Sequence, residues 1–189
     1  MIRYIAFLRA INVGGQKLIK MAELARIFTV AGFRNVRTYI QSGNVIFDAA
    51  SANPAALRKK IEKTLQQALG YEVTVILRSL AEIESIVRRD PFKKIETGAE
   101  AMLFVVFLWE EPKRKPKLPL VSKTENLEVF AVKDRAAYIV SHRKKNGWFG
   151  FPNKFVEKEL GVPGTTRNFT TLRKIVDLAQ TESVSSKKK

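Results

Sequence analysis

The sequence predicts an α+β fold built in two consecutive halves. Segments with the two-residue period of β-strands alternate along the chain with segments that have the three- and four-residue spacing of amphipathic helices. Glycine, proline and asparagine separate these segments, as expected for turns. The chain has 189 residues, 46% of them hydrophobic and 28% charged, which is typical of a globular protein with one compact body or two small ones.

We expect a buried strand first, because residues 2–8 are apolar and rich in β-forming side chains. A helix is expected over residues 21–31, where apolar residues recur at three and four positions and Gly32 can end the helix in a left-handed conformation. Residues 36–41 and 45–47 alternate in polarity on either side of a short Gly/Asn segment. This arrangement is typical of a β-hairpin.

A second helix is predicted over residues 54–69, because apolar residues recur every four positions between a capping Asn53 and a terminating Gly70. Residues 73–77 alternate as a further strand. The order over residues 1–78 is therefore β-α-β-β-α-β, which is the order of a ferredoxin-like unit.

The next helix is expected to connect the two halves. Residues 79–82, Ser-Leu-Ala-Glu, match a capping box at a helix start. The helix should end near Asp90, because the residue before Pro91 avoids helical geometry. We take residues 79–91 as this connector helix.

We expect residues 92–182 to form a second, smaller α+β half. Its expected elements are a buried strand, a β-hairpin, a short helix ended by Gly161 and a final helix, over residues 102–109, 127–141, 155–160 and 169–179. Residues 183–189 end in three lysines after a serine-rich stretch and are interpreted as a flexible basic tail.

Composition excludes several kinds of chemistry. Cysteine is absent and His142 is the only histidine, so thiolate and multi-histidine metal sites cannot form, and we expect neither a metal nor a cofactor. The net charge is +16, shared equally by residues 1–89 and 90–189, which favours contact with polyanions. The apolar runs are too short for a signal peptide or a membrane span. We therefore expect a cytoplasmic protein without a membrane partner.

Three polar segments are candidate ligand-binding regions. Residues 9–15 follow the first strand and combine side-chain donors with two glycines that expose backbone N–H groups. Residues 41–44, Gln-Ser-Gly-Asn, lie at the hairpin tip, where the same residue types also have ordinary turn roles. Residues 164–168 precede the final helix, whose N-terminus beside Arg167 would suit an anion. The candidate ligand-binding residues are Arg9, Asn12, Gly14, Gly15, Ser42, Asn44, Thr166, Arg167 and Asn168.

Two other features have alternative interpretations. His142 precedes three cations and is either a surface histidine or a general base. Residues 148–151, Trp-Phe-Gly-Phe, adjoin these cations and are either a buried cluster, which is the commoner role of large aromatic residues, or an exposed surface for stacking nucleic-acid bases.

The three polar segments resemble the signatures of domain-of-unknown-function family 1697, in residues 8–15, 38–45 and 165–171. The resemblance covers nearly the full length of the chain. It implies a mainly bacterial protein with a two-part α+β fold of ferredoxin-like character, and it implies no reaction. The family usually has glycine where this chain has Ala10 and tryptophan where it has Phe169.

The sequence favours binding of a phosphate-bearing or other anionic small molecule in a cleft where the three segments meet. One alternative is a nucleic-acid-binding protein whose basic surface includes residues 113–117, residues 143–145 and Trp148. A second alternative is a small metal-independent hydrolase or transferase that uses water activated by His142 or a carboxylate. The residues alone decide neither whether the protein is an enzyme nor its oligomeric state.

Overall fold

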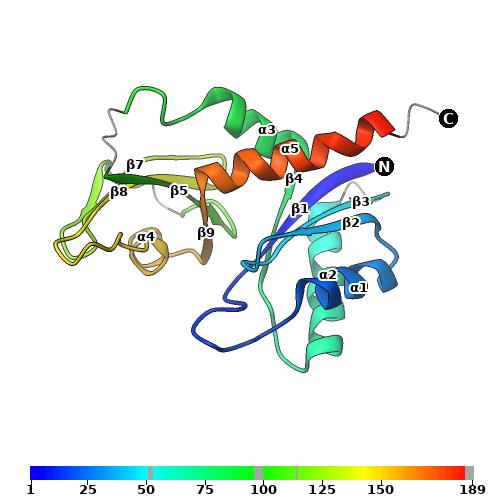
Figure 1. Ribbon diagram of the computed structural model, residues 1–189. Coiled ribbons are helices and arrows are strands. Elements are labelled where there is room, and N and C mark those ends of the chain that lie inside the picture. The colour runs from blue at the N-terminus through cyan, green and yellow to red at the C-terminus, as the bar shows by residue number, and fades with distance from the viewer. Residues whose placement is uncertain (51–52, 96–99, 114, 186–189) are drawn as a thin grey trace. The chain divides into compact units, whose positions relative to one another are not determined.

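The computed structural model describes residues 1–50, 53–95, 100–113 and 115–185 (Figure 1). These residues form an α+β protein with two antiparallel sheets and five helices, in agreement with the predicted class. The chain divides into two compact units, which we call the N-terminal unit, Met1–Ser85 with Ile175–Lys189, and the C-terminal unit, Ile86–Lys174. The lysines of the predicted basic tail and Arg114 of the basic stretch 113–117 lie outside the described residues.

The N-terminal unit contains a four-stranded antiparallel sheet in the order β2-β3-β1-β4. Its elements follow the predicted β-α-β-β-α-β order: β1 Ile2–Leu8, α1 Met21–Val30, β2 Arg34–Tyr39, β3 Asn44–Ala49, α2 Pro54–Leu69 and β4 Val75–Ser79. The helix α3, Leu80–Arg89, begins in this unit and ends in the next one.

The predicted helix boundaries have the expected local causes. The Asn53 side chain accepts hydrogen bonds from the N–H groups of Ala55 and Ala56, and Gly70 ends α2 with a φ of 76°. The backbone N–H of Ser79 donates to Glu82 at 2.7 Å, which completes the predicted capping box of α3.

The two faces of the four-stranded sheet are covered differently. On one face, Ala6, Leu8 and Phe47 pack in one core with Leu24 and Phe28 of α1 and with buried residues of α2. On the other face, arginines of the sheet donate to backbone carbonyls of the helix α5, Phe169–Ser185. Arg3 donates to the carbonyl of Ala179, and Arg37 donates to that of Leu178 at 3.3 Å. These contacts agree with the assignment of the last part of the chain to the N-terminal unit.

The C-terminal unit contains a five-stranded antiparallel sheet in the order β6-β7-β8-β5-β9. The predicted strand and hairpin are present, and α4 packs Val156 and Leu160 against Phe104 and Val106 of the sheet. The elements are β5 Ala101–Leu108, β6 Leu120–Ser122, β7 Leu127–Lys133, β8 Ala136–His142, α4 Asn153–Leu160 and β9 Gly164–Asn168.

The structure differs from the sequence-based interpretation of residues 164–168. They form the strand β9, which pairs with β5 from Gly164 opposite Leu108 to Asn168 opposite Phe104. The segment was expected to be a loop that leads into a helix, because its polar residues are typical of a helix cap. The helix α5 does follow directly at Phe169. The short edge strand β6 was also not predicted.

No helix in the described part of the chain has both the length and the apolar character that a membrane span requires.

Candidate functional site

The first two candidate segments meet within the N-terminal unit. The side-chain amide of Asn12 donates to the carbonyls of Ile19 and Gln41, at 3.1 and 2.9 Å, and its oxygen accepts from the N–H of Ile19 at 2.8 Å. Asn12 therefore closes the loop of residues 9–20, which we call the N-terminal loop, and joins it to the β2–β3 turn.

Close packing at Gly43 strengthens this junction. The N–H of Leu8 donates to the Gly43 carbonyl at 2.9 Å. Gly43 has a φ of 74°, and a Cβ atom there would lie 2.5 Å from Ile11 Cδ1 and 3.0 Å from Leu8 Cβ. Only glycine fits this position, so the Gln-Ser-Gly-Asn segment has a structural reason for its sequence.

Asn44 also has a structural role. It is fully buried, and its amide donates to the Tyr39 carbonyl at 2.8 Å and to the Ser42 hydroxyl at 3.1 Å. The predicted ligand donors Asn12 and Asn44 thus use their amides to hold the loop and the turn. Gly14 and Gly15 remain exposed at a turn with φ of 59° and 75°, and Arg9 is half-buried at the start of the loop.

The third candidate segment lies in the C-terminal unit and is largely buried. Thr166 and Arg167 are 8% and 6% exposed. The Arg167 guanidinium donates to the Thr165 hydroxyl at 2.9 Å and to the Thr166 carbonyl at 2.8 Å. Burial lowers the pKa of Arg167 to about 9, which still leaves it charged at neutral pH. Within this segment, Asn168 does cap α5, since its side chain accepts from the N–H of Thr170 at 2.8 Å.

Residues 142–152 form an exposed segment between β8 and α4, which we call the basic hairpin. Arg143 and Phe149 face each other as a β-bridge, and the N–H of Lys144 donates to the Trp148 carbonyl at 2.8 Å. Gly147, with a φ of 81°, makes the turn, and the N–H of Trp148 donates to the Asn146 side chain at 3.1 Å. The backbone around Trp148 is therefore fixed by hydrogen bonds.

The base of the hairpin is held against the β6–β7 turn. A Cβ atom at Gly150 would lie 1.9 Å from the Glu125 carbonyl oxygen, so the two backbones touch. The hydroxyl of Ser141 donates to the Gly150 carbonyl at 3.0 Å, and the Asn126 side chain donates to the Arg143 carbonyl at 3.1 Å. Gly150 is required here because no side chain fits between the two segments.

The exposure of the aromatic residues in the hairpin contradicts the sequence-based interpretation, which favoured a buried cluster. Trp148 is 74% exposed and Phe151 is 61% exposed. Phe149 is half-buried, with the Arg143 guanidinium 5.1 Å from its ring centre. Phe151 makes an edge-to-face contact with Phe104, at 6.2 Å between the ring centres. Of the alternatives that the sequence left open, exposed aromatic surface next to cations is the one observed for Trp148 and Phe151.

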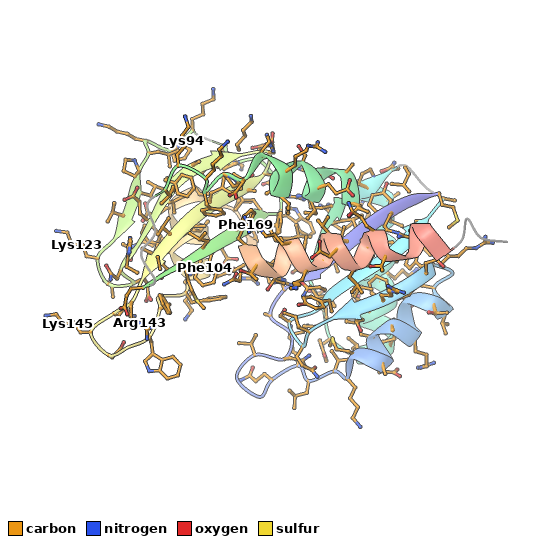
Figure 2. All side chains as sticks on the ribbon, turned by 45° about the horizontal axis from the view of Figure 1, so that its top comes forward. Lys94, Phe104, Lys123, Arg143, Lys145 and Phe169 are labelled. Carbon is orange, nitrogen blue, oxygen red and sulfur yellow. The ribbon has the colours of Figure 1, made fainter. Side chains whose placement is uncertain are left out.

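The cations of the hairpin have two different roles. Arg143 pairs with Glu100 at 3.1 Å and Lys144 pairs with Glu125 at 3.2 Å, so both help to position the hairpin. Within the described part of the chain, Lys123 and Lys145 are exposed and have no partner. Figure 2 shows both lysines extending outward at the end of the unit where Arg143 lies. Lys123 was not singled out from the sequence, because one lysine in a turn carries no signal of its own.

His142 is exposed at the end of β8, where its backbone N–H donates to the Asn126 carbonyl at 2.8 Å. The adjacent acidic residues Glu110 and Glu111 are also exposed, beyond the end of β5. The exposed positions of His142, Glu110 and Glu111 do not support a catalytic role for His142.

Comparison with known families identifies the chain's relatives. The family model described as "Protein of unknown function (DUF1697)" matches residues 1–138. The chain belongs to this family. The match contains the first two signature segments and ends before the third, so the DUF1697 assignment rests on residues 1–85 of the N-terminal unit and on most of the five-stranded sheet.

One solved structure similar to this DUF1697 chain is that of the conserved bacterial protein SP0830 from Streptococcus pneumoniae. The TM-score is 0.65 and the sequence identity is 22%, over 95% of this chain and 99% of the other. At this identity the likeness shows a shared fold. No protein with a curated description matches the chain.

Proposed function

We propose that this protein binds phosphate-bearing polyanions through the basic hairpin and Lys123. The observation that carries the proposal is the presence of two exposed lysines, Lys123 and Lys145, at the same end of the C-terminal unit (Figure 2). Residues 142–154 contain four lysine and arginine side chains and no carboxylate. Such a local excess of positive charge attracts polyanions and adds to the net charge of +16.

The ion pairs of the hairpin support this proposal. Glu100 and Glu125 partly neutralise Arg143 and Lys144, but they also fix the backbone from which Lys145 extends. A ligand would therefore meet a preformed surface and would not have to order a loop when it binds. The unpaired lysines can contact phosphates without first breaking an ion pair.

The proposal is tested with inorganic polyphosphate and the double variant Lys123→Ala/Lys145→Ala. The matched control is Lys59→Ala/Lys63→Ala, which removes the same charge from exposed positions on α2. We expect the first variant to weaken binding and to reduce the slope of log affinity against log salt by about two, roughly one for each lysine removed, and the control to change little. Equal effects of the two variants would show that only the overall charge matters and would refute the proposed surface.

We also propose that the N-terminal unit is a ferredoxin-like fold. The β-α-β-β-α-β order and the antiparallel strand order β2-β3-β1-β4 support this assignment. A fold of this kind is a scaffold for many functions, so the assignment adds nothing to the choice of ligand.

A small-anion site at the N-terminal loop is the second candidate function. It is supported by the junction that Asn12 makes between the first two predicted segments, which leaves Gly14 and Gly15 exposed near Arg9 in the sequence. Exposed glycine N–H groups beside an arginine are suitable donors for a phosphate oxygen.

This second candidate predicts that Arg9→Ala reduces the increase in melting temperature produced by inorganic phosphate. Arg34→Ala, at an exposed arginine of β2, is the matched control and should keep the phosphate effect. Arg167→Ala should lower the melting temperature because Arg167 is buried, while the increase with phosphate remains. An unchanged phosphate effect in Arg9→Ala would exclude the N-terminal loop as the site.

A further inference from the structure

Two large aromatic side chains of the basic hairpin face solvent three residues apart. Trp148 and Phe151 are among the most exposed apolar residues of the described chain, although tryptophan is on average a highly buried residue type. Both rings are presented by a backbone that hydrogen bonds and the Gly150–Glu125 contact hold in place. Their exposure therefore belongs to a fixed conformation.

The rings belong to the same hairpin as the cations described above. Lys145 is three residues from Trp148, and Lys154 is three residues from Phe151. Met102 of β5 is also partly exposed, in the strand that supplies Phe104 beneath Phe151. An aromatic surface in a segment rich in cations is complementary to a ligand that has both flat apolar faces and negative charges.

A single-stranded nucleic acid is the polyanion that has both properties. Its unpaired bases offer faces for stacking on tryptophan and phenylalanine, and its phosphates pair with lysine. In a duplex the base faces are covered by their neighbours, and inorganic polyphosphate has no bases. The charge around the rings also disfavours a purely apolar partner, which would have to remove water from the lysines without pairing them.

We infer that the polyanion bound by this surface is a single-stranded nucleic acid whose bases stack on Trp148 and Phe151. This inference rests on the proposed function, because the phosphates are assigned to Lys123 and Lys145. The aromatic rings add what the lysines alone do not provide, namely a preference for unpaired bases.

The intrinsic fluorescence of the protein provides a direct test. The chain has two tryptophans, Trp109 and Trp148, so the variant Trp109→Phe leaves Trp148 as the single reporter. Oligodeoxythymidine of about ten nucleotides, within the usual site sizes of single-strand binders, serves as the probe. We expect it to quench Trp148 emission, whereas the duplex of the same length and inorganic polyphosphate should leave the emission nearly unchanged.

Substitutions separate stacking from apolar contact. Trp148→Leu keeps an apolar side chain without an aromatic face, and we expect it to weaken oligonucleotide binding about tenfold or more. Trp148→Phe should retain a measurable part of the affinity, and Phe151→Leu should have a smaller effect in the same direction. Neither leucine variant should change the affinity for polyphosphate, and circular dichroism checks that the exposed substitutions leave the fold intact.

The outcomes distinguish the two proposals. Polyphosphate binding that depends on the two lysines, without oligonucleotide quenching and with unchanged oligonucleotide affinity in Trp148→Leu, would overturn the stacking inference and leave the proposed function standing. Absence of binding to either probe would refute both. Stronger binding to the duplex than to the single strand would also overturn the stacking inference.

Discussion

Asp48 and Arg3 lie opposite each other on β3 and β1 and share two hydrogen bonds, of 2.7 and 2.9 Å. Asn35 donates to the same carboxylate at 2.7 Å. The hydrogen bonds from Arg3 are the main reason why the pKa of Asp48 is lowered, and the partial burial of the carboxyl opposes them. The folded state thus favours ionised Asp48.

Asp48→Asn is expected to lower the free energy of unfolding by about 2 kcal/mol at neutral pH, because it removes the charge from a partly buried hydrogen-bonded pair. The contribution of ionised Asp48 is complete above its unfolded pKa of about 4 and is lost as the pH falls through its lower folded pKa. Urea unfolding of both proteins between pH 7 and pH 3 should show the difference shrinking in acid.

Glu23→Gln is the control for this measurement, because it breaks an exposed pair with Arg26 that has similar geometry, 2.7 and 2.9 Å. Exposed pairs contribute little, so its stability should stay close to that of the parent protein. A pH-independent difference between Asp48→Asn and the parent would contradict the assignment of the effect to ionisation.

The sequence identifies the polar residues of the candidate segments, but it does not predict the hydrogen bonds that they make within the fold. Asn12 and Asn44 are candidate ligand-binding residues because an amide can bind a ligand. Their actual partners, the carbonyls of Gln41 and Tyr39, are set by how the chain returns on itself. No local sequence pattern shows how the chain folds back, so an asparagine that holds the fold together cannot be distinguished in the sequence from one that binds a ligand.

Among the structural elements, those with strong periodicity and clear caps were predicted well. Asn53 and Gly70 mark the two ends of α2, and the Ser79–Glu82 box marks the start of α3. The strand β9 was missed because its residues, Gly-Thr-Thr-Arg-Asn, are polar and typical of a cap, and pairing with β5 decides their conformation. Tertiary pairing here overrides local preference.

The β2–β3 turn depends on glycine at position 43. Gly43→Ala should lower the free energy of unfolding by about 3 kcal/mol, because the added Cβ both requires a left-handed alanine and overlaps Ile11 and Leu8. Urea denaturation measures this loss.

Gly14→Ala is the matched control, since Gly14 also has a positive φ but has no atom within 4 Å of the added Cβ. Gly14→Ala should lower the free energy of unfolding only by the cost of a left-handed alanine backbone, about 1 kcal/mol. If the two variants were equally destabilised, close packing between the turn and the N-terminal loop would not be the reason for glycine at position 43.

In the whole molecule, the α+β class could be predicted from the sequence. The sequence predicts two halves that follow one another along the chain, whereas the N-terminal unit also includes the end of the chain. Residues 175–185 join the N-terminal unit through Arg3 and Arg37, whose partners on α5 are 176 and 141 residues away along the chain. Contacts between residues so far apart along the chain produce no periodic pattern in the sequence. The net charge was likewise predictable from composition, but the positions of the unpaired lysines depend on which cations find a carboxylate in the folded unit.

The discontinuous N-terminal unit has a consequence for the order of events during synthesis. One face of its sheet is covered by α5, so the first 85 residues leave the ribosome without the segment that completes them. All of residues 86–174 must be made before Leu178 and Ala179 become available to the two arginines. At typical translation rates this delay is on the order of ten seconds, during which the face of the nascent sheet that carries Ile5, Phe7 and Ile46 beside the two arginines lacks its helix and is open to chaperone binding.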